Sequence, residues 1–127
     1  MRNILVDTDV LINFLRGKGS ARDFLASIVS ESVLYVSVIT VAELYRGALP
    51  HEAERTKALL NGLTIVDVTR DIAEKAGSYK HAIKSQRQEL IDCLIAATAY
   101  ATRAILATSN AKHYPMPDIE TIHVPTR

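Results

Sequence analysis

The sequence has few of the residues that form covalent cross-links or membrane spans. Cys93 is its single cysteine in 127 residues. One cysteine excludes an intramolecular disulfide and a multi-cysteine zinc site, and it fits a reducing compartment. No apolar run reaches the ~18 residues of a membrane span, and the run Ile4–Val6 is too short for the core of a signal peptide. These absences predict a soluble, cytoplasmic protein with no membrane contact.

The sequence also lacks a marked excess of charge of either sign. Lys and Arg number 15 against 14 Asp and Glu, a formal net charge of +1, so the whole-chain balance does not by itself indicate a nucleic-acid partner. The shares of hydrophobic residues (48%) and charged residues (23%) are ordinary, which excludes a disordered chain. No repeat or linker interrupts it, and its length predicts one domain over residues 1–127.

Short apolar runs alternate with helical patterns along the chain. The expected strands are Ile4–Val6, Val33–Val38, Thr64–Val68, Ala104–Ala107 and Ile119–Val124. The expected helices are Thr8–Leu15 (stopped by Gly17), Ser20–Val29 with Ser20 as cap, Thr40–Leu49, Glu52–Leu63, a long helix capped by Thr69 and running to about Gln86, and Gln88–Thr102. Strands separated by helices pair in parallel through crossover connections. We therefore expect a three-layer α/β/α sandwich with a mostly parallel central sheet, whose chemistry lies beyond the carboxyl ends of the strands.

Three carboxylates lie inside apolar stretches. Asp7 follows Ile4–Val6 directly, Glu43 lies in an apolar helical segment, and Asp92 lies in another. Burying an unpaired carboxylate costs several kcal/mol, and apart from Arg46 these stretches offer no basic residue. Carboxylates that converge on one point require a hard divalent cation, and all-oxygen ligation selects Mg²⁺ or Mn²⁺.

Each acid also has a purely structural explanation. Thr40 and Glu43 have the spacing of a capping box, Asp9 is a suitable cap for the first helix, and Asp92 falls early in its helix, where the helix dipole favours an acid. Asp7 is harder to explain, since Asp9 already serves as a cap. These explanations stay open for each acid alone, but all of them together, on separate elements, are less convincing.

Polar residues also follow the expected strand Ala104–Ala107. Thr108, Ser109 and Asn110 are typical of a turn, because such side chains bond to their own backbone. They also place oxygen atoms at the carboxyl end of a strand, where Asn110 could bind a metal ion or position a water molecule.

Four stretches, in order along nearly the whole chain, together resemble the PIN-domain ribonucleases, most closely the VapC toxins of bacterial and archaeal toxin–antitoxin pairs. They read ILVDTDVLI at 4–12, TVAELYRG at 40–47, DCLIAATA at 92–99 and TSNAKHY at 108–114. The resemblance implies that Asp7, Glu43 and Asp92 bind Mg²⁺ or Mn²⁺. The family often has Asp at the positions of Asn110 and His113, so the part of the metal site that the fourth stretch contributes is less acidic in this chain. Asp9, where the family commonly has Ser, Asn or Thr, adds ligand charge or caps the helix.

The same resemblance implies the reaction and the partners. The expected activity is that of an endoribonuclease toxin, in which a metal-activated water, oriented by Asp92 or Asn110, hydrolyses the RNA phosphodiester. The expected products carry 5′-phosphate and 3′-hydroxyl ends, and Thr108 is expected to position the site. The expected assembly is a homodimer with a small VapB-like antitoxin, whose C-terminal segment covers the site.

Basic residues gather in one acid-free stretch. Lys80, Lys84 and Arg87 are spaced i, i+4, i+7, which predicts one helix face. Such a face is either solvated or a track for RNA phosphates. Arg46 is a further candidate for RNA contact, or an ion-pair partner of a site carboxylate. We expect the four histidines at the surface or in turns, and Cys93 in the core. Without the site acids, the rest of the chain is modestly basic.

Other protein classes also have an acidic residue at the end of the first strand, as Asp7 is here. A haloacid-dehalogenase-like phosphatase would use Asp7 as nucleophile, but Asp92 precedes the strand that leads to Thr108, so the order of motifs fails. A response-regulator receiver needs a central phospho-acceptor, and no Asp lies between Asp23 and Asp67. A non-catalytic PIN fold that only binds RNA or a partner is the remaining alternative, and the three retained acids argue against it.

Overall fold

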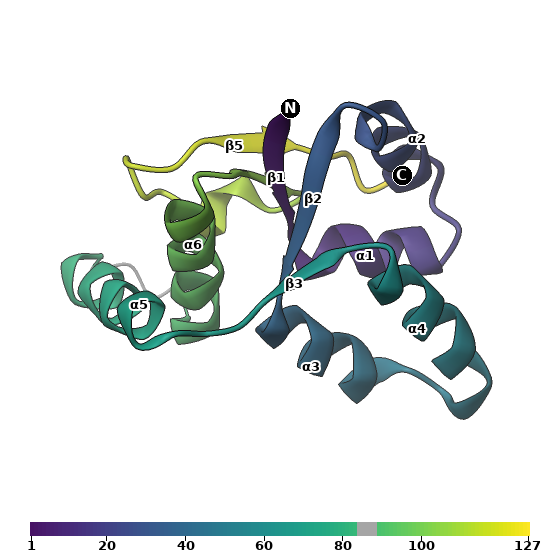
Figure 1. Ribbon diagram of the computed structural model, residues 1–127, viewed down its shortest axis with the longest axis horizontal. Helices are drawn as coiled ribbons and strands as arrows, with labels where there is room; N and C mark the ends of the chain where they lie inside the picture. The colour runs from purple at the N-terminus through teal and green to yellow at the C-terminus, as the bar shows by residue number, and fades with distance from the viewer. Residues whose placement is uncertain (84–88) are drawn as a thin grey trace.

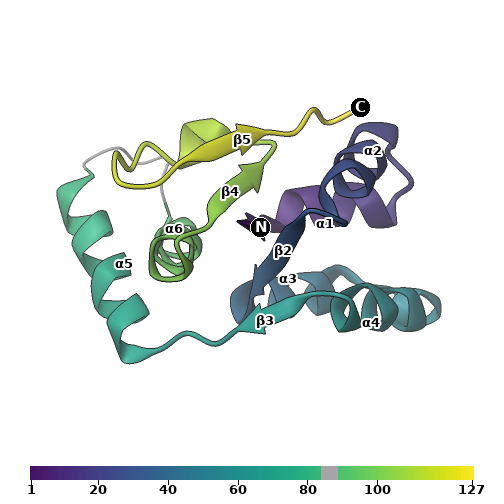
Figure 2. The ribbon, with the colours of Figure 1, turned by 45° about the horizontal axis from the view of Figure 1, so that its top comes forward.

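The computed structural model describes residues 1–83 and 89–127, and a parallel β-sheet forms its centre (Figures 1 and 2). The sheet has five strands in the order β3-β2-β1-β4-β5, and every neighbouring pair is parallel. The strands are β1 (Arg2–Val6), β2 (Ser32–Ser37), β3 (Thr64–Val66), β4 (Ile105–Thr108) and β5 (Thr121–His123). The predicted parallel α/β sandwich is confirmed.

Helices cover both faces of this sheet (Figure 2). On one face lie α1 (Thr8–Leu15), α2 (Gly19–Ile28) and α4 (Ala53–Asn61), and on the other lie α5 (Arg70–Ala82) and α6 (Leu90–Thr102). The helix α3 (Val38–Gly47) continues from the end of β2 and contributes Ile39 to one core and Leu44 to the other. Two short 3₁₀ helices, η1 (Pro50–Glu52) and η2 (Ala111–His113), complete the described elements.

The central strand shows why the first apolar run of the sequence is continuous. Successive side chains of a strand point to opposite faces, so Ile4 and Val6 pack against α1 and α2 while Leu5 packs against α5 and α6. All three are at most 1% exposed. A parallel sheet covered on both faces needs apolar residues at every position of its central strand.

Most helix boundaries lie within two residues of the expectation, and capping explains some of the differences. The Thr69 side chain accepts a hydrogen bond from the Ile72 backbone and caps α5 as predicted, and Gly17, with φ of 76°, follows the end of α1. The prediction that Ser20 caps the second helix is wrong, because that helix begins at Gly19 and its N-cap is Lys18.

Further differences concern α3 and α5. The helix α3 begins at Val38, two residues before the predicted Thr40, because the side chain of Ser37 caps it. The described helix α5 ends at Ala82, and the predicted boundaries at Gln86 and Gln88 lie outside the described residues. None of the helices in the described ranges is long and apolar enough to cross a lipid bilayer.

The topology places a crevice at one end of the sheet. The chain passes from β1 to β2 through α1 and α2 on one face, and from β3 to β4 through α5 and α6 on the other. The connections therefore diverge between the neighbouring strands β1 and β4. In open α/β sheets, ligands bind beyond the carboxyl ends of the strands at this switch point. Asp7 and Thr108 stand at those two ends.

Candidate metal and catalytic site

A pocket of about 230 Å³ opens at this switch point. It is formed by Asp7, directly after β1, and by Asn110, in the loop after β4, together with residues of α1, α3, α6 and η2. The four candidate acids, which come from three separate helices and one strand end, all line it: Asp7, Asp9, Glu43 and Asp92. Asn110, His113 and Tyr114 complete its polar lining.

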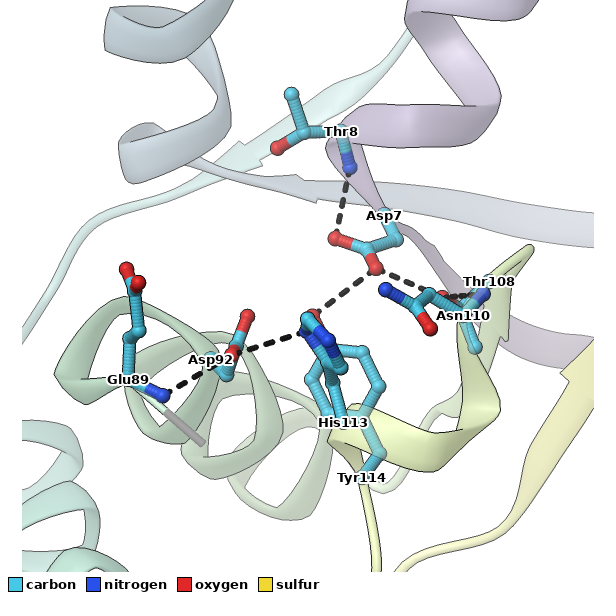
Figure 3. A network of polar contacts seen from close by, with 8 residues as sticks. All are labelled: Asp7, Thr8, Glu89, Asp92, Thr108, Asn110, His113 and Tyr114. Atoms are coloured by element: carbon cyan, nitrogen blue, oxygen red, sulfur yellow. Dashed lines mark hydrogen bonds and ion pairs between the residues drawn. The ribbon is translucent and has the colours of Figure 1, made fainter. Parts of the chain in front are cut away.

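Asp7 is the most enclosed of these acids, with 7% of its surface exposed. Its Oδ1 accepts a hydrogen bond of 2.8 Å from the Thr8 backbone N–H, so Asp7 is the N-cap of α1. Its Oδ2 accepts two more, from the Thr108 hydroxyl at 2.8 Å and from the Tyr114 hydroxyl at 2.9 Å (Figure 3). The alternative that Asp9 caps this helix is therefore wrong.

The surroundings of Asp7 disfavour its negative charge. Burial, followed by repulsion from Asp9, raises the pKa of Asp7 to about 6, although its three hydrogen-bond donors act in the opposite direction. Burial and the neighbouring acids also raise the pKa of Tyr114, so its phenol remains a protonated donor. The site thus holds a carboxylate in a place where only an added positive charge would fully stabilise it.

The two carboxylate oxygens of Asp9 have different surroundings. Its Oδ2 accepts from the Ser109 backbone N–H at 3.2 Å. Its Oδ1 is buried and has no hydrogen-bond partner among the described residues. Burial raises the pKa of this carboxyl as well. Buried carboxylate oxygens without partners are rare and costly, so this atom marks a place suited to a cation.

Glu43 is held by a chain of hydroxyl groups. The Thr8 hydroxyl donates to Glu43 Oε1 at 2.6 Å and lies 2.9 Å from the Thr40 hydroxyl. Because a hydroxyl has a single proton, Thr40 must be the donor to Thr8. The capping-box explanation of Thr40 and Glu43 is wrong, since Ser37 caps α3 by accepting from the Ile39 backbone at 3.1 Å.

Asp92 serves both its helix and the pocket. It is the third residue of α6, early in its helix as expected, and its Oδ2 accepts a hydrogen bond from the Glu89 backbone N–H at 3.1 Å, a contact that was not predicted. The same oxygen lies 3.3 Å from His113 Nδ1 (Figure 3). His113 ends η2, and its ring belongs to the pocket, in keeping with the resemblance, which placed this position at the metal site.

The stretch after β4 supplies contacts that the sequence suggested only in part. Thr108 holds Asp7, as a positioning residue would, and its oxygen also accepts from the Asn110 backbone N–H at 3.0 Å. Asn110 is exposed at the pocket. The role of Tyr114 was missed. The sequence feature that could have indicated it is a tyrosine at the end of the fourth stretch, because a buried phenol hydroxyl usually has a hydrogen-bond partner.

Two of the four basic candidates belong to the part of the chain that the structure describes. Arg46 is exposed on α3, and among the described residues no ion pair joins it to Glu43, so the ion-pair alternative is not observed. Lys80 is exposed near the end of α5. Lys84 and Arg87 lie outside the described residues.

The donor set fits a hard divalent cation, although the side chains are not gathered around one. Within residues 1–83 and 89–127, no three His, Cys, Asp or Glu side chains are close enough together to hold a metal ion. Glu43 contacts Thr8 and Asp92 contacts His113 instead. The carboxylate oxygens of the pocket are the ligands that Mg²⁺ and Mn²⁺ prefer, and the buried Asp9 Oδ1, which has no hydrogen-bond partner among the described residues, is one of them.

Comparisons with known proteins agree with this geometry. Residues 4–118 match the PIN domain. The chain is 41% identical over 115 residues to Ribonuclease VapC10 of Mycobacterium tuberculosis, which covers 89% of this chain and 86% of the relative. It is 32% identical over 120 residues to Ribonuclease VapC19 of the same organism, which covers 91% and 96% of the two chains.

A solved structure shows the same likeness. It is a toxin–antitoxin complex from Klebsiella pneumoniae, with a TM-score of 0.81 and 30% identity. The match covers 95% of this chain and 99% of that one.

Proposed function

The chain belongs to the PIN-domain family, and we propose that it is a metal-dependent endoribonuclease, the toxin of a toxin–antitoxin pair, acting as one domain over residues 1–127 in the cytoplasm. The observation that carries the proposal is the pocket at the switch point, which four acids line and where one buried carboxylate oxygen has no partner among the described residues. The two curated relatives are both named as ribonucleases.

The acids have distinct parts in this proposal. Asp7, Glu43 and Asp92, with Asp9 beside them, hold Mg²⁺ or Mn²⁺. When bound, such an ion activates water near neutral pH and stabilises the negative charge that develops on phosphate. Thr108 orients Asp7, and the exposed amide of Asn110 lies where it can position water or a phosphate oxygen. Because water is the nucleophile, the RNA 2′-hydroxyl takes no part.

Cleavage products test the reaction directly. The purified chain with Mg²⁺ or Mn²⁺ should cut RNA to 5′-phosphate and 3′-hydroxyl ends, which end-specific sequencing identifies after induced expression as well. Asp7→Asn should abolish cleavage while the fold is kept. Ends with 2′,3′-cyclic phosphate would exclude this mechanism, and full activity of the variant would show that the site is misassigned.

The proposed RNA track involves Arg46, Lys80, Lys84 and Arg87. A Lys80/Lys84/Arg87 triple variant should bind RNA more weakly. The slope of log affinity against log salt should become shallower by roughly 2, since about 0.7 counterions are released per single-strand phosphate contact. An unchanged slope would remove these three residues from the RNA path.

A groove supports an antitoxin as the partner. The groove measures about 660 Å³, lies between α1, α2 and α4, and is lined mainly by apolar side chains that include Phe14, Leu25 and Leu63. A smaller pocket of about 100 Å³ shares Arg55 with this groove and Glu43 with the acid pocket. A segment seated in the groove can therefore reach the acids and place a basic side chain among them.

A single exposed side chain tests this path. Val29, 59% exposed, lines the groove, so Val29→Glu should prevent co-purification with the product of a short reading frame next to the gene. Ile65→Glu, at an exposed position on β3 outside the groove, is the control. Equal retention by both variants would place the partner elsewhere.

A homodimer is the remaining part of the proposal. Tyr45 on α3 and Leu90 and Ile91 on α6 are large apolar side chains that stay exposed, which fits a surface covered by a second copy. Leu90→Glu should shift the mass measured by light scattering from dimer to monomer, and a monomeric parent chain would contradict the proposal.

A further inference from the structure

Asp7 is bound by more donors than a helix cap requires. Each carboxylate oxygen has two lone pairs in the plane of the group. Thr108 and Tyr114 together occupy both lone pairs of Oδ2, whereas the Thr8 backbone occupies only one of Oδ1. Among the described contacts, Oδ1 is therefore the single oxygen of Asp7 that retains a free lone pair.

Tyr114 is fixed in place by its packing. Only 6% of its surface is exposed, and its ring belongs to the hydrophobic core beneath α5 and α6. Its hydroxyl projects from that core into the pocket and meets Asp7 (Figure 3). The phenol cannot move away from Asp7 without disturbing the core, so the occupation of Oδ2 is a built feature of the site.

This contact has a consequence for the ion that the site accepts. We propose that Tyr114 is a positioning residue that restricts Asp7 to one-oxygen ligation through Oδ1 and thereby selects small octahedral cations over Ca²⁺. Mg²⁺ binds single carboxylate oxygens in an octahedron, whereas Ca²⁺ takes six to eight oxygens and readily accepts both oxygens of one carboxylate. The inference rests on the proposed metal site and deepens it.

Tyr114→Phe is the direct test, because it keeps the ring and removes the hydroxyl. In the variant, Oδ2 regains a lone pair, so Asp7 can offer both oxygens and Ca²⁺ gains affinity relative to Mg²⁺. We expect the ratio of the Ca²⁺ Kd to the Mg²⁺ Kd to fall about fivefold, equivalent to roughly 1 kcal/mol. Titration calorimetry of the chelator-treated full chain with each metal chloride alone, without RNA, measures both constants.

Tyr79→Phe is a matched control. The Tyr79 hydroxyl also donates to a carboxylate, Asp118, at 2.7 Å, but this pair lies outside the acid pocket. The control variant should lose a similar hydrogen bond and leave the Ca²⁺ to Mg²⁺ ratio unchanged. Thr108→Val, which frees the other lone pair of Oδ2, should lower the ratio in the same direction and serves if Tyr114→Phe does not fold.

The outcomes separate this inference from the proposed function. A parent chain that binds neither cation would overturn the metal site itself and this inference with it. A parent chain that binds Mg²⁺, with folded variants whose ratio is unchanged or whose affinities for both ions fall equally, would overturn the selective role of Tyr114 alone.

Discussion

Replacing Asp7 by Asn should stabilise the cation-free protein at neutral pH. The folded state raises the pKa of Asp7 from 3.8 to about 6, mainly through burial. The folded protein therefore binds this proton more tightly than the unfolded chain does, and the free energy of unfolding falls as pH rises from about 4 to about 6. Above that window the ionised carboxylate keeps its full cost, which an uncharged Asn avoids.

The size of the effect follows from the same shift. The rise of the Asp7 pKa from 3.8 to about 6 corresponds to a loss of at most about 3 kcal/mol in the free energy of unfolding at neutral pH. Asn caps helices about as well as Asp, so the bond from the Thr8 backbone to this position remains. The hydroxyls of Thr108 and Tyr114 must turn to accept from the new amide, which offsets ~1 kcal/mol. We expect a net gain of about 2 kcal/mol.

Urea unfolding in the presence of EDTA measures this difference. At pH 7.5 the variant should be more stable than the parent, and near pH 4 the two should converge as Asp7 becomes protonated. Asp23→Asn, on a side chain 75% exposed, removes the same charge and should change stability by less than ~0.5 kcal/mol. Saturating Mg²⁺ should stabilise the parent and not the variant. An Asp7→Asn chain that is no more stable than the parent at pH 7.5 would refute the reasoning.

Other substitutions test separate contacts. Thr40→Val removes the hydroxyl that fixes Thr8 against Glu43, so it should lower the free energy of unfolding in urea by about 1 kcal/mol. It should also weaken Mg²⁺ binding measured by calorimetry, and unchanged binding would show that the metal site does not need this chain of hydroxyl groups. Ser37→Ala removes the cap of α3, and should lower the unfolding free energy by about 1 kcal/mol. Asp118→Asn should cost no more than ~1 kcal/mol at pH 7. Hydrogen bonding to Lys75 lowers the pKa of Asp118, so this loss should vanish as pH falls well below 3.8, and a loss that persists in acid would contradict the assignment.

Regular hydrophobic patterns predicted the fold because they reflect local geometry. The first strand and the helix Thr8–Leu15 follow from the apolar run and from Gly17 after it, and the structure has that helix at the predicted bounds. The predicted start of α3 was wrong because Ser37 and Thr40 are both good helix caps and lie three residues apart. Burial decides between them: Thr40 is fully buried and its hydroxyl meets Thr8 across the fold.

The grouping of the acids was predictable, but their partners were not. A parallel sheet brings the carboxyl ends of its strands to one edge, so Asp7 and the residues after β4 had to lie near each other. The bond from Tyr114 to Asp7 joins residues 107 positions apart. Such a contact depends on side-chain rotamers in a packed core, which no spacing in the sequence encodes.

The hydrogen-bond and ion-pair partners of the acids explain why the pocket favours binding of a cation. Arg22, Arg70 and Lys75 form ion pairs with Asp23, Glu74 and Asp118, all outside this pocket. Within residues 1–83 and 89–127, Asp92 is the only one of the four pocket acids with a side chain capable of positive charge at ion-pair distance, His113. An arginine would suit acids with a purely structural role, because it binds carboxylates in a bidentate manner and cancels their charge. Hydroxyl groups fix the direction of Asp7 and Glu43 and leave the charge in place. The carboxylates of the pocket are thus held in fixed directions but their charge is not neutralised. Such a pocket favours a divalent ion during cleavage and a basic side chain of a partner when cleavage is blocked.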